Sequence, residues 1–148
     1  MHPDSIRLLE LEPSDSYEDD LHATVITARL GDKPAYEAIS YTWGEDIFPE
    51  MLHLTVAGHT LRWEVRSKIQ ISENLASALR RFRRKDSKRT LWADAVCINQ
   101  SDNLEKAWQV SLMKRIFKNA EQVLIWLGKE TDETGPALEY VRQVATLA

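Results

Sequence analysis

The sequence has only one cysteine, Cys97, so the chain cannot form a disulfide within itself. Its first residues, MHPDSIRLLELEPSD, lack the basic segment and apolar run of a secretory signal. No stretch approaches the roughly 20 apolar residues that span a membrane. These absences predict a soluble protein of a reducing compartment, the cytoplasm, with no membrane span.

Common catalytic and cofactor motifs are also missing. There is no G-x-G-x-x-G and no P-loop, so the usual dinucleotide and phosphate cradles are excluded. There is no C-x-x-C, no H-E-x-x-H and no G-x-S-x-G. The four histidines (His2, His22, His53 and His59) have no metal-motif spacing. The sequence therefore predicts no metal and no bound cofactor.

The net charge of -4 gives no global reason to expect nucleic acid as a partner. The charge is uneven, however. Residues 1–20 hold seven acids against Arg7, and residues 80–89 hold seven bases against Asp86. The basic run is typical of a solvated helix end, and the alternative is a patch that docks on an acidic surface.

Short apolar or β-branched runs dominate the first half of the chain. We expect strands at Ile6–Leu11, Leu21–Leu30 and Tyr36–Trp43. Gly58-His59 between two further runs, His53–Ala57 and Thr60–Trp63, indicates a hairpin.

The period then changes to that of helices. Ser72 is a good N-cap for ENLASALRRFRR. The run 91–98 and the run 122–128 are almost continuously apolar, as in strands covered on both faces. Helices are expected at 103–119 and 136–148. From residue 72 on, the resulting α-β-α-β-α order predicts a parallel sheet, and the β-rich first half either makes this sheet mixed or adds a β-rich appendage to it. The pattern stops inside a helix without a cap, so we expect 1–148 to be one domain at the N-terminal part of a longer protein.

Two polar features interrupt the apolar pattern. Asp94 stands in the middle of the expected strand 91–98, where a buried carboxylate is more often a structural hydrogen-bonding group than a catalytic one. On a helical wheel, an apolar arc of the helix 103–119 includes Leu104, Trp108 and Val110, and Glu105 and Gln109 project from its middle. Glu105 can complete a capping box with Asp102 as N-cap, and it can line a cleft; the first does not exclude the second.

These features should meet at one place. Glu105 follows the strand 91–98, and Trp43, Gly44 and Asp46 follow the strand 36–43. If the two strands are parallel, their carboxyl ends share one edge of the sheet, where open α/β sheets bind ligands.

The blocks YEAISYTWGE, ISENLASALRRF and LWADAVCINQ, with the pattern that continues to Trp126-Leu127-Gly128, resemble the HET (heterokaryon incompatibility) domain of filamentous fungi. The resemblance implies a cell-death effector domain of non-self recognition, joined to other domains. HET domains are in turn similar to TIR domains, whose first strand and loop resemble YEAISYTWGED. This implies an α/β, TIR/flavodoxin-like fold with a mainly parallel sheet, flanking helices, the N-terminal appendage and a hairpin insertion.

Many TIR domains cleave NAD⁺ with one glutamate on the helix before the fourth strand, and Glu105 is the closest match. By this resemblance Glu105 is the candidate catalytic residue, with NAD⁺ as a possible substrate. The substrate-binding candidates are Trp43, Gly44, Asp46, Asn99, Asp102 and Gln109.

Two functions follow from these observations. One is an NAD⁺ glycohydrolase, in which Glu105 stabilises the oxocarbenium-like ribose. The other is a non-enzymatic signalling module that acts by self-association or partner binding, in which Trp43 and Glu105 are core and cap residues.

Overall fold

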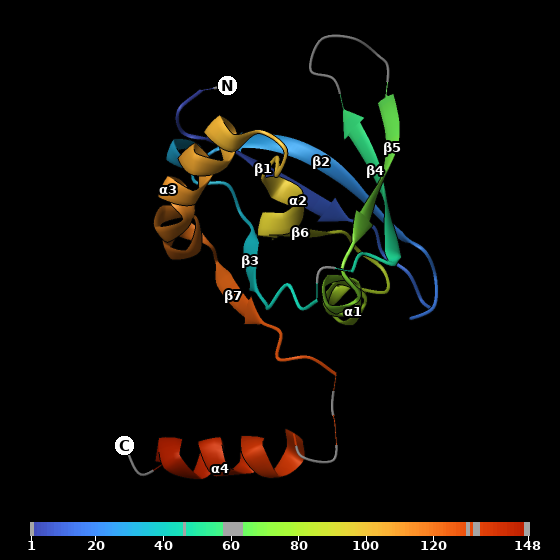
Figure 1. Cartoon of the computed structure of the whole chain (residues 1–148), viewed down its shortest axis with the longest axis vertical. Coiled ribbons are helices and arrows are strands. Elements are labelled where there is room, and N and C mark those ends of the chain that lie inside the picture. Colours follow the sequence, from blue (N-terminus) through green and yellow to red (C-terminus); the bar gives the residue numbers. More distant parts are fainter. Residues whose placement is uncertain (1, 46, 58–63, 130, 132–133, 147–148) are drawn as a thin grey trace.

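The computed structural model describes residues 2–45, 47–57, 64–129, 131 and 134–146. Seven strands form one mixed sheet with the order β5-β4-β2-β1-β6-β3-β7 (Figure 1). The strands are β1 (Ser5–Leu11), β2 (Leu21–Arg29), β3 (Glu37–Ser40), β4 (Glu50–Ala57), β5 (Glu64–Ile71), β6 (Arg89–Trp92) and β7 (Gln122–Ile125). The helices are η1 (Leu30–Asp32), α1 (Glu73–Phe82), α2 (Asp94–Cys97), α3 (Asn103–Asn119) and α4 (Thr134–Thr146).

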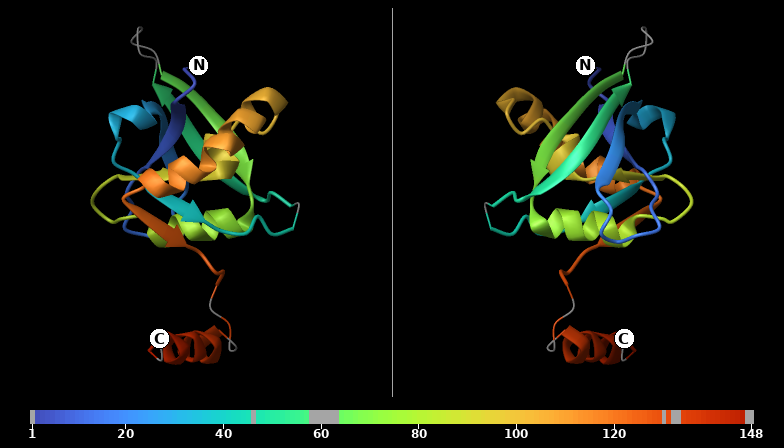
Figure 2. Two further views of the ribbon diagram at one scale, coloured as in Figure 1. Left: turned by 90° about the vertical axis from the view of Figure 1, so that its left-hand side faces the viewer. Right: turned by 90° about the vertical axis from the view of Figure 1, so that its right-hand side faces the viewer.

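The strand pairing confirms an α/β protein but corrects the expected arrangement of its halves. β3 pairs in parallel with both β6 and β7, so the condition that the strands 36–43 and 91–98 be parallel is met. The first strands are no appendage, because β1 pairs antiparallel with β2 on one side and with β6 on the other. The two halves of the sequence therefore share one sheet, and α2 and α3 lie on the same side of it (Figure 2).

The apolar run 91–98 is not one strand. β6 ends at Trp92, and α2 begins at Asp94, whose Oδ1 accepts a hydrogen bond from the Ala95 N–H at 2.8 Å. Asp94 is thus at a helix start and not in the middle of a strand. A short buried helical turn and a buried strand both read as uninterrupted apolar sequence, so periodicity could not separate them.

The run 122–128 is also less covered than expected. β7 ends at Ile125, at the edge of the sheet, and the side chains of Val123 and Ile125 are 40% and 66% exposed. The prediction of a strand buried on both faces is therefore wrong here. The hairpin prediction is right in kind, since β4 and β5 are antiparallel, but β5 begins at Glu64. The expected strand Thr60–Trp63 lies outside the described residues.

The two longer helices near the sheet begin where the sequence predicted. The Ser72 side chain accepts a hydrogen bond from the Leu75 N–H at 3.1 Å, and the Asp102 side chain caps α3. α3 packs through Leu112 and Ile116, both buried, and Phe117 meets the Trp92 ring edge-on at 5.5 Å between centroids. None of the described helices is long and apolar enough to cross a membrane.

The buried face of α3 differs from the predicted apolar arc. Leu104 is 86% exposed, and Trp108 and Val110 are each 49% exposed, so these three residues do not belong to the buried face. Gln109 is buried, which confirms its predicted position in the middle of that face. The centre of the buried face runs through Gln109, Leu112 and Ile116. The Trp108 indole instead donates to the Pro3 carbonyl at 2.8 Å, at the margin of the fold.

The basic run 80–89 contacts acidic segments of its own chain. Arg83 donates to the main-chain carbonyls of Ser16 and Asp20, each at 2.9 Å. Lys88 pairs with Glu12, and Arg89 pairs with Glu37. Arg83 and Lys88 thus contact the acidic N-terminal segment, and Arg89 contacts β3, so this part of the run is more than a solvated helix end.

The orientation of α3 predicts a contrast between two leucines on the same helix. Leu112→Ala should lower the free energy of unfolding by about 2–5 kcal/mol, because it leaves a cavity in the core. Leu104→Ala should change it by less than about 0.5 kcal/mol, because the side chain is exposed. Urea denaturation of both variants measures the difference, and equal losses would refute the orientation.

Candidate functional site

Trp43 lies just beyond the end of β3 and is fixed by a side chain from α2. Its indole N–H donates to Asp94 Oδ2 at 2.9 Å, while the ring stays 39% exposed. The next residue, Gly44, has φ +75°, in the left-handed region that favours glycine. Asp94 therefore orients Trp43, and Gly44 turns the chain away from the sheet.

A groove of about 870 Å³ opens beside Trp43. One wall is the sheet face of β2, β4 and β5, and the other is α2 with the loop that follows it. Apolar side chains dominate its lining, which includes Val25, Val56, Ile69, Val96 and Ile98. Such a volume and lining are typical of small-molecule sites.

The polar groups of the groove gather near α2. Arg7, Tyr41, Asn99, Gln100 and Ser101 line it together with Trp43. Among the described lining residues Arg7 carries the only charged side chain. Burial raises the pKa of the Tyr41 hydroxyl, and the nearby Asp94 carboxylate adds to this shift. Tyr41 is therefore a neutral phenol at physiological pH.

A smaller hollow of about 450 Å³ also borders Trp43 and is lined by Gly44, Asn74 and Lys129. Asn74 donates to the Thr42 carbonyl at 2.6 Å and accepts from the Trp126 indole at 2.8 Å. It thereby ties the chain leaving β3 to the chain leaving β7. The carboxyl ends of the parallel strands thus lie at the rim of this smaller hollow.

Glu105 is held by β1 and by the loop after α2. Both of its carboxylate oxygens accept from the Arg7 guanidinium, with Nη2 at 3.0 Å from Oε2. Oε1 also accepts from the Asn99 N–H at 3.1 Å, and Arg7 Nη1 donates to the Cys97 carbonyl at 3.2 Å. Hydrogen bonding to Arg7, and to a lesser extent to Asn99, lowers the pKa of Glu105 below its ordinary value. The carboxylate is anionic and charge-paired.

The capping-box expectation is half right. Asp102 Oδ1 accepts from the N–H groups of Leu104 and Glu105 at 3.0 and 3.1 Å. The Glu105 carboxylate, however, accepts its hydrogen bond from the Asn99 N–H and not from the Asp102 N–H. An arginine within reach competes for the carboxylate, because the charge-assisted bidentate pair is the stronger interaction.

The remaining candidates are spread around this centre. Asn99 lines the groove, whereas Gln109 is buried and donates from Nε2 to the Ser5 carbonyl at 2.9 Å. Asp102 is exposed at the cap of α3. Glu105 lies behind Arg7 and is not among the groove's lining residues, and Asp46 lies outside the described residues. The structure therefore places Trp43 and Asn99 at one groove. Arg7 also lines this groove and binds Glu105 on its other side.

Sequence reasoning missed two features. Arg7 is the partner of Glu105, and its signal was its position as the lone base among seven acids in residues 1–20. His22 and His53 have no motif spacing, but β2 and β4 pair in register and set them side by side. The single thiol offers no nucleophile, since burial raises the pKa of Cys97 to about 12.

The family model of the heterokaryon incompatibility protein (HET) matches residues 36–148. The chain belongs to the HET family. It is also 35% identical over 144 residues to heterokaryon incompatibility protein 6, OR allele, of Neurospora crassa, a match that covers 94% of this chain. The chain spans about a fifth (21%) of the length of that relative. No solved structure matches the chain.

The residues of the candidate site fall on both sides of the start of the HET match. Trp43, Asp94, Asn99 and Glu105 lie inside the matched range, and Arg7 lies before it. The HET segment thus receives the partner of its glutamate from a strand outside the match.

The Arg7–Glu105 pair predicts a pH effect on stability. The folded-state pKa of Glu105 is lowered from its ordinary value of 4.5, so the unfolded chain binds more protons as the solution becomes acidic. The stabilisation is complete above pH 4.5 and is lost as the pH falls through the folded-state pKa. Glu105→Gln should therefore lower stability at pH 7 and flatten its decline below pH 4.5.

Urea denaturation between pH 3 and pH 7 would measure this effect, with Glu121→Gln as the control for removing one carboxylate. An unchanged acid dependence in Glu105→Gln would contradict the role of the pair.

Proposed function

We propose that this HET chain is an effector domain of heterokaryon incompatibility whose groove beside Trp43 binds NAD⁺ or a related nucleotide. The observation that carries the proposal is the groove itself. It joins a partly exposed indole, apolar walls and one arginine in a hollow of ligand size. A flat base can stack on Trp43, and a phosphate suits the guanidinium of Arg7.

Arg7 also gives the ligand a way to reach Glu105. In the free chain Arg7 neutralises the carboxylate. A phosphate that takes over the Arg7 guanidinium releases Glu105 as an anion, and its side chain can then turn from behind Arg7 toward the ribose. The exposed fractions of the two side chains, 25% and 17%, leave this exchange accessible from solvent.

The released carboxylate suits the cleavage of the nicotinamide–ribose bond. That bond breaks with its electron pair leaving on nicotinamide, and the positive charge that develops on the ribose is stabilised by Glu105. Water then adds to the ribose and loses a proton, so NAD⁺ and water give nicotinamide, ADP-ribose and H⁺. The resemblance of YEAISYTWGED to the first TIR strand and loop supports this reaction.

A second candidate is a non-enzymatic module that triggers death by self-association. It is favoured by exposed apolar side chains on α3 and β7, which include Leu104, Trp108 and Ile125. In this case Arg7 and Glu105 serve only to fasten β1 to α3, and the groove has no part in the response.

Nicotinamide release separates the two candidates. The purified chain, alone and artificially clustered, is incubated with NAD⁺. Glu105→Gln should reduce release by about 100-fold or more, because the anion that stabilises the transition state is lost. Glu121→Gln, an exposed glutamate beyond α3, should release as much as the wild type.

Binding is measured separately by calorimetry with NAD⁺. Trp43→Ala should weaken binding, and Trp43→Phe should retain most of it because the stacking face remains. Absence of release from the clustered chain would refute the hydrolase, and absence of binding would refute the nucleotide groove as well.

A further inference from the structure

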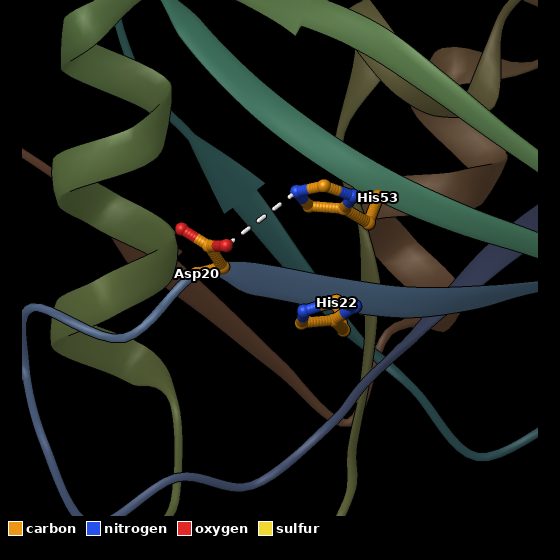
Figure 3. Close-up of side chains that lie close together, drawn as sticks. All are labelled: Asp20, His22 and His53. Atoms are coloured by element: carbon orange, nitrogen blue, oxygen red, sulfur yellow. Dashed lines mark ion pairs between the residues drawn. The ribbon is translucent and has the colours of Figure 1, made fainter.

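Three side chains of kinds that can bind metal ions lie close together on a face of the sheet away from the groove. His22 on β2 and His53 on β4 are register partners in a parallel pair, so both project from the same face. Their rings stack with centroids 4.6 Å apart and planes inclined by 19°. Asp20 precedes β2 and turns its carboxylate toward His53 (Figure 3).

Asp20 Oδ2 and His53 Nε2 are 3.8 Å apart, which is within ion-pair distance but longer than a hydrogen bond. One ligand atom from each residue lies within 4.8 Å of the others. Two imidazole nitrogens and one carboxylate oxygen form a donor set that suits zinc and similar ions.

We propose that Asp20, His22 and His53 bind a divalent first-row transition ion, with Zn²⁺ as the occupant. Three protein ligands leave one tetrahedral position to water. Zinc–ligand bonds of about 2.0–2.1 Å put the donors about 3.3 Å apart, so the side chains close in when the ion binds. Asp20 and His22 are exposed, which leaves their side chains free to rotate inward.

The backbone around the site is already fixed. The His22 carbonyl accepts from the Glu12 N–H at 2.9 Å, which extends the pairing of β1 and β2 beyond β1. The Asp20 carbonyl accepts from Arg83 at 2.9 Å. The ion therefore orders side chains only, and the entropic cost of forming the site is low.

The charge around the site is mixed. A hollow of about 680 Å³ beside the two histidines is also lined by Glu12, Arg66 and Lys68. Lys68 is the register partner of His53 on β5, and both of the basic side chains are exposed. Their length lets them extend into solvent, which keeps their charges away from the ion.

Zinc titration of the whole chain, purified without a histidine tag, tests the site. Calorimetry should give one Zn²⁺ per chain, and Co²⁺ should give a visible d–d spectrum of a four-coordinate ion. His22→Gln, His53→Gln and Asp20→Asn should each weaken Zn²⁺ binding at least about tenfold. The melting temperature of the wild type should rise with Zn²⁺ concentration.

Two variants serve as matched controls: His2→Gln removes a histidine on another segment, and Asp19→Asn removes the neighbouring acid. Both should bind Zn²⁺ as the wild type does. Circular dichroism of the metal-free variants verifies that each is folded. No binding by the wild type, or undiminished binding by both folded histidine variants, would overturn the proposal.

Discussion

Strand β1 is hydrogen-bonded along both edges, and the rest of the fold depends on this double pairing. Its antiparallel ladders to β2 and β6 join the strands β2, β4 and β5 to the strands β6, β3 and β7 in one sheet. Four of its side chains are buried hydrophobics, namely Ile6, Leu8, Leu9 and Leu11. A charged side chain on a strand enclosed in this way is unfavourable without a partner, and β1 carries Arg7.

The position of Arg7 explains much of the candidate site. A partly buried guanidinium needs anionic and carbonyl partners, and it finds them in Glu105 and in the Cys97 carbonyl. These contacts fix the loop after α2 against the sheet, which forms one wall of the groove. The carboxylate expected to act alone is therefore part of a pair, and its partner Arg7 precedes the residues that the HET model matches.

Local signals in the sequence predicted a good part of this structure. Ser72 and Asp102 mark helix starts through their own side chains. The parallel pairing of β3 with β6 was a condition of the expected site and is present in the structure. The failures involve contacts distant in sequence. The apolar pattern of α3 did not reveal that Leu104 faces solvent, because the neighbours of a helix decide which of its apolar side chains are covered. The pairing of β2 with β4 likewise has no trace in the spacing of its histidines.

Helix α1 runs between the groove and the segment that carries Asp20. Ser72, its N-cap, lines the groove beside Trp43, and Arg83, its C-cap, donates to the carbonyl of Asp20. A ten-residue helix is about 15 Å long. A displacement of α1 along its axis would therefore change contacts at both ends. If ligands at the two ends preferred different positions of α1, each would change the affinity of the other by the same factor.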